Sequence, residues 1–439
     1  MAKKTIKIDT AGYSDFIIEK SNTRYILEEG DLLDFKEIRT DGASTISNIE
    51  LMIDGVITGN GGALDIGKAD SLSNKIVVGE TGVLDATDAA IIAFGQKTVI
   101  TNFGAIFTSE PSNSIGVQSE GDGGRILNAG YLKAETCIIV TGDGNTVKND
   151  GQLATHMGGT GVVFDSATGD VNRLINRGYI DGSNAVEGGD GSERITNRGR
   201  IVGDLELGAG DDILTSFMGI GGDVSMGSGN DRVVIRGKGD FTQVYADAGD
   251  DVFDLRGAQA ISSGTTIAGG MDDDTYIVTR NDLKLEELAG QGTDTVRSSV
   301  SFTLGAAFEN LVLTGNKSID GTGSAVANII IGNGSANTLN GMSGADTLDG
   351  GGGNDVLTGG GQIDMFVFRT RTGKDRITDF TDASDKIDLS DYKGISAFED
   401  LEGRISQNGT DAVITLKNGD RITLDNFDAG NLTMVDFQF

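Results

Sequence analysis

The chain has 439 residues, with 68 glycines but only one proline, one cysteine, one histidine and no tryptophan. These counts exclude a collagen-like repeat, a disulfide-stapled scaffold and zinc sites built from Cys and His clusters. The 66 acidic and 35 basic residues give a net charge of -31, which repels nucleic acid and anionic membranes and favours cations as partners.

The first 50 residues are expected to form strands or a short helix that caps one end of the fold. The start of the chain lacks the apolar segment of a cleaved signal peptide, and no run of 18 or more apolar residues predicts a membrane helix. We therefore expect no membrane insertion. The protein is expected either to stay in the cytosol or to be exported by a route that ignores the N-terminus.

Residues 51–206 carry a seven-residue pattern, I-x-N-x-G-x-I, at 100–106, 126–132, 147–153, 174–180 and 195–201. Short β-branched runs between Gly, Asn, Asp and Ser turns predict a parallel β-helix in which each repeat is one coil. The asparagine of the pattern is expected to stack into an interior amide ladder. Its members are Asn102, Asn128, Asn149, Asn176 and Asn197.

Residues 207–322 keep a similar period and add acidic Gly-x-Gly-x-Asp-type turns, which begin at 207, 226, 246, 269 and 289. One such turn per coil places the aspartates in a column along one edge of the solenoid. This column predicts a line of metal sites at Asp212, Asp231, Asp251, Asp274 and Asp294.

Residues 323–367 are five contiguous nonapeptides that match the calcium-binding pattern G-G-x-G-x-D-x-U-x. From about residue 207 onward the chain resembles the RTX (repeats-in-toxin) family of secreted Gram-negative proteins. The resemblance implies a calcium β-roll with two nonapeptides per 18-residue coil and an apolar core position at Ile330, Leu339, Leu348, Leu357 and Phe366.

The same resemblance implies that position-six side chains two repeats apart face each other across a bound ion. The pairs are Asn328 with Asp346, Asn337 with Asp355, and Asp346 with Asp364. Several Ca²⁺ ions are the expected cofactors, because carboxylates and turn carbonyls supply the six to eight oxygens that calcium takes. The ligands are expected to be Asn337, Asp346, Asp355 and Asp364, with binding weakest at the asparagine end.

Residues 368–439 leave the nonapeptide period and are expected to form a small β cap, with a hairpin turn at Asn418 and Gly419. The resemblance implies an uncleaved C-terminal signal read by a type I secretion apparatus. Asp436 among Phe437 and Phe439 fits such a signal. The expected location is therefore outside the cell, at the surface of a Gram-negative bacterium.

No catalytic constellation is recognisable in the sequence. His156 lies in a glycine-rich turn without a serine nucleophile motif, and the Asp-Pro-His signature of mannuronan epimerases is absent. We therefore expect a protein that is not an enzyme. Five arginines recur in the coil register. They are explained either by binding of an acidic polysaccharide or a phosphorylated surface glycan, or by ion pairs with nearby Asp and Glu. The five are Arg125, Arg173, Arg177, Arg194 and Arg198.

Together these features predict an all-β fold, a right-handed parallel β-helix (51–206, then 207–322 with calcium-type turns) continuing into an RTX calcium β-roll (323–367), with caps at 1–50 and 368–439. The expected function is that of a secreted, calcium-dependent structural protein that polymerises with itself at the cell surface, in an S-layer, sheath or matrix filament. It is similar in this to calcium-dependent RTX S-layer proteins. The alternatives are a monomeric adhesin that binds cell-surface polysaccharide, and a β-helix polysaccharide lyase or epimerase.

Overall fold

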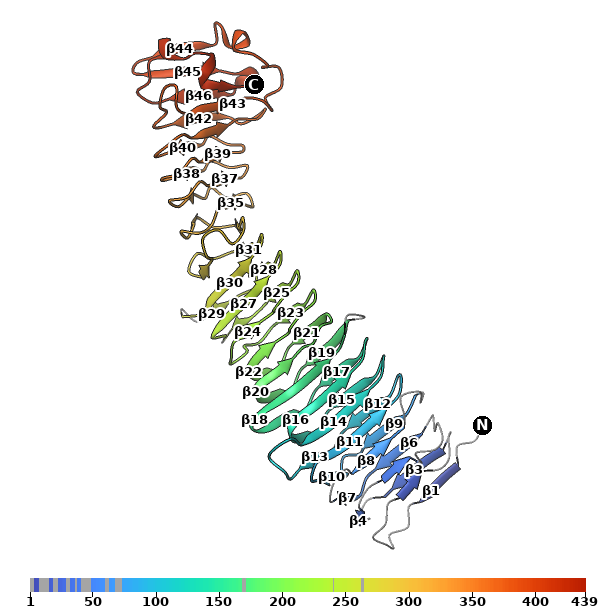
Figure 1. Cartoon of the computed structure of the whole chain (residues 1–439). Helices are drawn as coiled ribbons and strands as arrows, with labels where there is room; N and C mark the ends of the chain where they lie inside the picture. Colours follow the sequence, from blue (N-terminus) through green and yellow to red (C-terminus); the bar gives the residue numbers. More distant parts are fainter. Residues whose placement is uncertain are drawn as a thin grey trace. The chain divides into compact units, whose positions relative to one another are not determined.

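The repeats form short parallel strands that stack coil upon coil in the computed structural model of the chain (Figure 1). It describes residues 4–7, 16–18, 23–28, 32–35, 38–40, 49–59, 63–67, 73–167, 171–239, 241–261 and 264–439, with the backbone alone at 4–7, 16–18, 32–35, 38, 39, 59, 239 and 260. The chain divides into two compact units. Unit 1 is Met1–Asp247 with Gly257–Thr265, and unit 2 is Ala248–Arg256 with Thr266–Phe439.

Each coil of unit 1 contributes one strand to a parallel sheet, here called sheet A, whose register follows the I-x-N-x-G-x-I pattern. Its strands are β1 (Lys4–Lys7), β3 (Thr23–Leu27), β6 (Glu50–Ile53), β9 (Lys75–Val78), β12 (Val99–Asn102), β15 (Arg125–Asn128), β17 (Thr146–Asn149), β19 (Asn172–Asn176), β21 (Glu193–Asn197), β23 (Ile213–Ser216) and β25 (Arg232–Ile235).

The rest of each coil forms a second parallel sheet, sheet B, in which a long strand can pair with two successive short strands of the coil before it. Its strands are β2 (Phe16–Ile18), β4 (Leu32–Phe35), β5 (Ile38–Thr40), β7 (Val56–Gly59), β8 (Leu64–Ile66), β10 (Val83–Ala86), β11 (Ala89–Phe94), β13 (Ala105–Thr108), β14 (Ile115–Glu120), β16 (Tyr131–Thr141), β18 (Gln152–Asp165), β20 (Tyr179–Glu187), β22 (Arg200–Glu206), β24 (Val224–Ser225) and β27 (Gln243–Ala248). A separate short pair joins β26 (Lys238–Gly239) to β29 (Ala260–Ile261).

The predicted asparagine ladder is confirmed. Asn102, Asn128, Asn149, Asn176 and Asn197 are all buried, and each amide nitrogen donates to the amide oxygen of the next coil at 2.8–2.9 Å until Asn197 donates to Ser216 Oγ. The same nitrogens also donate to backbone carbonyls, as Asn149 Nδ2 does to Tyr179 O at 3.1 Å. The ladder therefore supplies hydrogen bonds to buried amide and carbonyl groups at this turn, which lose their bonds to water on folding.

The pattern's glycine is fixed by a close approach between coils. A Cβ at Gly178 would lie 1.9 Å from the carbonyl oxygen of Gly151 in the preceding coil. No side chain fits there, so the turn stacks directly on the turn before it.

The first 50 residues do not form a separate cap where the structure describes them. β1 pairs in parallel with β3, β2 with β5, and β4 with β7, so these strands extend the same solenoid toward the N-terminus. The short helix that the sequence allowed is not present among the described residues of this segment.

Unit 2 is also built as a solenoid and contains the β-roll. One of its strand rows is β28 (Val252–Asp254), β31 (Thr275–Val278), β33 (Thr295–Ser298), β35 (Asn310–Leu313), β37 (Ile329–Ile331), β39 (Thr347–Asp349), β41 (Met365–Val367), β43 (Lys386–Asp388) and β47 (Phe437–Gln438). The opposite row is β34 (Phe302–Thr303), β36 (Gly321–Thr322), β38 (Thr338–Asn340), β40 (Val356–Thr358) and β42 (Lys374–Ile377), and a further pair joins β30 (Thr266–Met271) to β32 (Lys284–Glu286).

The register confirms two nonapeptides per coil. Ile329 pairs with Thr347 on one side and Thr338 with Val356 on the other, each a step of 18 residues. The five predicted core positions, Ile330 to Phe366, are all fully buried. The fold is therefore an all-β parallel solenoid with a β-roll toward its C-terminus.

The C-terminal segment closes the roll with antiparallel strands β44 (Ile405–Asn408), β45 (Asp411–Thr415) and β46 (Arg421–Leu424). The predicted hairpin turn is present, with Asn418 and Gly419 both at positive φ inside η2 (Lys417–Gly419). The other 3₁₀ turns are η1 (Phe398–Leu401), η3 (Ala429–Asn431) and η4 (Met434–Asp436). In the folded chain Asp436 is buried and accepts the Ala383 and Thr433 N–H groups, so it fastens the last strand to the cap.

None of the helices among the described residues has the length and apolar character needed to cross a bilayer.

The asparagine ladder gives the first testable prediction. Replacing Asn149 by alanine removes the acceptor of Asn128 and the donor to Asn176, so the free energy of unfolding in calcium is expected to fall by about 2–4 kcal/mol. Denaturant titration measures the change. Thr146→Ala on the outward side of the same strand is the control, with a change expected within about 0.5 kcal/mol. Equal effects of the two substitutions would contradict a stabilising ladder.

Candidate metal centre

One buried position recurs at the turn that leads into each strand of sheet A. In successive coils of unit 1 it is occupied by Asn145, Asn172, Glu193, Asp212 and Asp231, and each of these side chains is at most 2% exposed. The position thus changes from amides to carboxyl groups along the chain. A cation is needed only in the coils where the position is occupied by a carboxyl group, as the hydrogen bonds below show.

Both the oxygen and the nitrogen of each amide side chain at this position have hydrogen-bond partners in the protein. Asn145 Oδ1 accepts the Gly124 N–H at 2.6 Å while its Nδ2 donates to Gly142 O at 2.9 Å. Asn172 repeats the arrangement, accepting the Asn145 N–H at 2.8 Å and donating to the same carbonyl at 3.2 Å. No ion is needed, because an amide both accepts and donates.

The carboxyl groups keep the accepting half of this arrangement and lose the donating half. Asp212 Oδ1 accepts the Glu193 N–H at 2.6 Å, and Asp231 Oδ1 accepts the Asp212 N–H at 2.7 Å. The second oxygens, Asp212 Oδ2 and Glu193 Oε2, are buried and have no hydrogen-bond partner. An ionised carboxylate cannot donate, so each such oxygen requires a proton or a cation.

The electrostatics agree with this geometry. Burial raises the pKa of Asp212 to about 9 and the pKa values of Glu193 and Asp231 to about 7, against the opposing effect of the backbone N–H groups. Without a counter-ion these groups favour the neutral acid, because desolvation penalises the charged form.

The predicted aspartates of unit 2 form the same kind of column. Asp274 Oδ1 accepts the Asp251 N–H and Asp294 Oδ1 accepts the Asp274 N–H, both at 2.9 Å. Glu309 Oε2 then accepts the Asp294 N–H at 2.9 Å. Within each unit the structure therefore joins the predicted residues as neighbours, Asp212 with Asp231 and Asp251 with Asp274 and Asp294.

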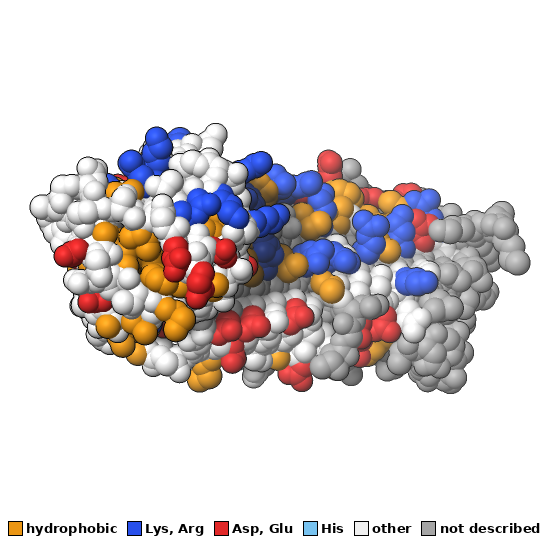
Figure 2. All heavy atoms as spheres, turned by 90° about the horizontal axis from the view of Figure 1, so that it is seen from above, with side chains coloured by type: hydrophobic (Ala, Val, Ile, Leu, Met, Phe, Trp, Pro, Cys, Tyr) orange, Lys and Arg blue, Asp and Glu red, His pale blue; other side chains and the backbone are white. Residues whose placement is uncertain are grey.

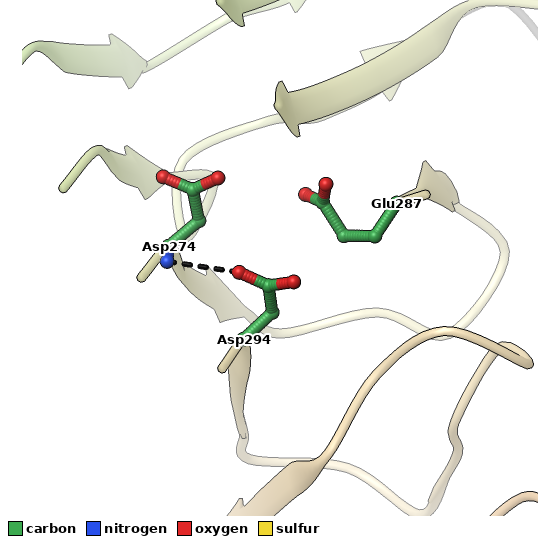
Figure 3. Close-up of side chains that lie close together, drawn as sticks. All are labelled: Asp274, Glu287 and Asp294. Atoms are coloured by element: carbon green, nitrogen blue, oxygen red, sulfur yellow. Dashed lines mark hydrogen bonds between the residues drawn. The ribbon is translucent and has the colours of Figure 1, made fainter. Parts of the chain in front are cut away.

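A cluster of three carboxyl groups forms beside this column (Figure 3). Ligand oxygens of Asp274, Glu287 and Asp294 all lie within 4.8 Å of one another. Asp274 Oδ2 is buried without a hydrogen-bond partner, and burial raises the pKa of Asp274 to about 8 and that of Asp294 to about 7. Three desolvated acids at this separation favour a divalent cation among them.

Sequence reasoning missed Glu287. It follows β32 in a stretch that lies outside the nine-residue pattern. Its carboxylate accepts the Gly269 and Gly270 N–H groups at 2.9 and 3.2 Å and the hydroxyl of the buried Tyr276, which hold it facing Asp274. Only the path of the chain between coils brings it there.

The roll contains two further columns. In one, Asn328, Asp346, Asp364 and Asp385 are linked by N–H to carboxylate hydrogen bonds of 2.7–3.0 Å. In the other, Asn337, Asp355 and Asp375 are linked in the same way at 2.8–2.9 Å. The two members of each predicted pair are therefore neighbours in the same column.

Each roll column begins with an asparagine that needs no ion. Asn337 Oδ1 accepts the Asn333 N–H at 2.9 Å and its Nδ2 donates to Ile319 O. Asn328 donates likewise to Phe308 O at 2.7 Å. In this structure Asn337 is a hydrogen-bonded turn residue, which differs from the ligand role expected for it, and that role remains a prediction.

Each roll column also ends in a satisfied carboxylate that the sequence did not single out. Asp375 Oδ2 accepts the Thr372 hydroxyl and Asp385 Oδ2 accepts the Thr381 N–H, both at 2.8 Å. Between the two ends, the second oxygens of Asp346 and Asp355 are buried without a hydrogen-bond partner.

The first glycine of each nonapeptide makes room for these inner oxygens. A Cβ at Gly341 would lie 2.3 Å from Asp346 Oδ2, and one at Gly350 would lie 2.5 Å from Asp355 Oδ2. The oxygen thus occupies the space that any other side chain would fill. With turn carbonyls nearby, the residues present fit a hard divalent cation at Asp346, Asp355 and Asp364.

The predicted arginines lie on the surface of unit 1. Arg125, Arg173 and Arg194 point outward from sheet A in one register row, in which Thr146 separates Arg125 from Arg173. Arg177 and Arg198 occupy the turn that follows the ladder asparagine. All five are exposed.

Comparison with known proteins agrees with the site. Residues 331–366 match the family model of the RTX calcium-binding nonapeptide repeat, in four copies. The protein is therefore of the RTX calcium-binding type, and calcium is its cofactor at multiple sites. RTX repeats are typical of secreted proteins.

Two curated relatives come from Rhizobium meliloti (strain 1021). The chain is 40% identical over 177 residues to the endo-1,3-1,4-beta-glycanase ExsH and 37% identical over 167 residues to the endo-1,3-1,4-beta-glycanase EglC. These matches cover 40% and 38% of this chain, and 36% and 33% of the relatives, so the chain spans about a third of their length.

Two solved structures are similar in part. The R3 subunit of the Azotobacter vinelandii mannuronan C5-epimerase AlgE6 matches with 27% identity and a TM-score of 0.24, over 29% of this chain and 81% of that one. The extracellular lipase LipA of Serratia marcescens matches with 18% identity and a TM-score of 0.25, over 54% of this chain and 42% of that one.

These relatives correct one expectation. The absence of a recognisable catalytic constellation led us to expect that the protein is not an enzyme. The two curated relatives are both named as glycanases, which overturns that expectation. Carboxylates that act on polysaccharides have no short sequence motif, so such residues would not stand out among the 66 acidic residues of this chain.

The raised pKa values predict how pH acts on the calcium-free fold. Asp346 and Asp364 reach about 6, Asp355 about 7 and Asp212 about 9, whereas aspartate in an unfolded chain titrates near 3.9. The folded state thus binds more protons, so calcium-free stability is expected to fall as pH rises from about 4 through 9. Thermal melting of the calcium-free protein should show a higher Tm at about pH 5 than at about pH 7.5. In calcium the order should reverse, because protons and the metal compete for the same oxygens.

The difference between asparagine and aspartate at this turn position predicts the effect of replacing Asp346 by asparagine. Asp346→Asn supplies a donor where Asp346 Oδ2 lacks a partner, so calcium-free stability should rise by about 1–3 kcal/mol while the stabilisation by added calcium shrinks. Paired denaturant titrations with and without calcium measure both effects. Asp382→Asn, which removes the same charge from an exposed position, should change neither. A loss of stability in both conditions would contradict a cation role for Asp346.

Proposed function

We propose that this RTX-type calcium-binding protein folds outside the cell when calcium enters its carboxylate columns, and that it acts there on extracellular polysaccharide. The observation that carries the proposal is the set of buried carboxylate oxygens without hydrogen-bond partners, at Glu193, Asp212, Asp274, Asp346 and Asp355.

Calcium concentration supplies the switch. Extracellular calcium modules bind with dissociation constants of roughly 10⁻⁴–10⁻³ M, far above the free calcium of the cytosol. Inside the cell the carboxylates would remain without counter-ions and the columns would oppose folding. Outside, metal binding and folding would occur together, which suits export of an unfolded chain through a type I secretion apparatus.

The polysaccharide part of the proposal draws on the relatives. Both glycanase relatives match about two fifths of this chain, and a solenoid presents regular outward-facing rows on which an extended polymer can lie. The proposal includes glycanase activity of this chain and its location at the bacterial cell surface.

The test separates folding from activity. Circular dichroism of purified protein, first freed of calcium and then titrated with it, should show a calcium-dependent gain of β structure. The calcium-loaded protein is then incubated with mixed-linkage β-1,3-1,4-glucan and with a polyuronate, and new reducing ends and unsaturated ends are measured. Equal order in excess chelator would overturn the calcium part. Absence of both cleavage and binding in a folded protein would overturn the polysaccharide part.

Self-assembly at the cell surface is a separate hypothesis with one supporting observation. Four apolar side chains of the roll are exposed, and exposed apolar groups favour contact between copies. They are Val326 at 36%, Ile329 at 47%, Met342 at 51% and Ile363 at 60%. Light scattering on addition of calcium should show polymers that an Ile329→Ser/Ile363→Ser variant does not form. Monomers throughout the titration would contradict assembly.

A further inference from the structure

Charge is segregated on the outer face of sheet A in unit 1. On its strands β15, β17, β19, β21 and β23 the outward positions carry Arg125, Lys148, Arg173 and Arg194 and no acidic residue. The whole chain has nearly twice as many acidic as basic residues. Figure 2 shows Lys and Arg side chains gathered in a band along one face.

The basic side chains stand at coil intervals. Arg173 pairs directly with Arg194 on the next coil, and Arg125 lies two coils before Arg173 in the same row. Neighbouring parallel strands are about 4.8 Å apart. The backbones of Arg173 and Arg194 are therefore separated by about one such spacing, and those of Arg125 and Arg173 by about two. Like charges this close repel one another unless an anion lies between them.

Nothing in the described part of the chain neutralises the row. No carboxylate of the described residues makes an ion pair with Arg125, Arg173 or Arg194, whereas Lys148 pairs with Asp150 at the edge of the face. Ion pairing with neighbouring acids, one of the two explanations open from the sequence, therefore does not account for these three arginines.

The adjoining turn adds more cations in the same two coils. Arg177 and Arg198 hold equivalent turn positions, with Arg177 3.9 Å from Asp150 and Arg198 placed 4.0 Å over the ring of Phe217. Beyond the turn, the half-buried Tyr179 pairs in register with the exposed Arg200. These residues lie on the same two coils as Arg173 and Arg194, in the turn and at the start of sheet B.

We propose that this surface, here called the arginine face, binds an extended uronic-acid polysaccharide. It comprises the outward side of sheet A from β15 to β23 and the turns at Arg177 and Arg198. The inference rests on the proposed action on polysaccharide and names its class of ligand. Guanidinium groups bind carboxylates through paired hydrogen bonds, and arginines that stand one and two coils apart along the solenoid suit a linear polymer with a charge on each sugar.

Nucleic acid fits this face less well. Its phosphates carry a denser charge, which the net charge of -31 on the whole chain repels. A polyuronate carries less charge per unit length, so the net negative charge of the chain repels it less.

The experiment uses the full-length, calcium-loaded protein and poly-mannuronate as the probe, with binding measured by calorimetry at several salt concentrations. The double variant Arg173→Glu/Arg194→Glu is expected to bind at least about tenfold more weakly than wild type. The matched control is Arg297→Glu/Lys393→Glu, which makes the same change of net charge at exposed positions of unit 2 and should bind like wild type.

Arg173→Lys/Arg194→Lys keeps the charge and removes the paired hydrogen bonds, so its affinity should fall between wild type and the glutamate variant. Circular dichroism and melting in calcium establish that each variant is folded, since all four positions are exposed. An unchanged affinity of the folded glutamate variant would overturn the arginine face, as would equal weakening by the control.

Tighter binding of double-stranded DNA than of poly-mannuronate would overturn the choice of ligand, and equal binding of a neutral β-glucan would overturn the role of charge. Failure of the proposed function itself has a different signature, namely order that does not depend on calcium or the absence of any polysaccharide binding by the wild type.

Discussion

A buried carboxylate with a backbone N–H at one oxygen and no donor at the other is the constraint on which this structure depends. The N–H of the neighbouring coil fixes the side chain at the turn, as the Asp212 N–H does by donating to Asp231 Oδ1. The second oxygen then has to be neutralised where water does not reach it. Calcium meets that need, and because the ligands come from successive coils, binding the ion also holds the coils together.

The same position shows what the fold does without a cation. Asn145 and Asn172 precede the acidic part of unit 1, and Asn328 and Asn337 precede the two acidic columns of the roll. An amide has nearly the shape of a carboxylate but adds a donor, so these coils are complete on their own. Under the proposed function, calcium dependence would be confined to the coils that carry carboxylates, and the amide coils of unit 1 would order without it.

The charge that remains is distributed unevenly. A subset of the acidic groups is buried in the interior columns, where calcium would neutralise them. The arginine face of unit 1 stays basic, and no carboxylate in the described ranges forms an ion pair with Arg125, Arg173 or Arg194. A calcium-binding interior and a basic outer face together suit the proposed work on acidic polymers in a calcium-containing medium.

The sequence alone was sufficient for the solenoid, for the asparagine ladder from Asn102 to Asn197, for the paired nonapeptides and for the aspartate columns. In a solenoid one repeat makes one coil, so residues at the same place in the repeat become neighbours in space. The sequence could not reveal Glu193 or Glu287, since neither occupies the pattern position of an aspartate, and it could not distinguish an asparagine that binds a metal from one that completes a turn. It also left open whether the arginines are paired. Those points depend on which groups from different coils come within hydrogen-bonding distance, and only the tertiary structure decides that.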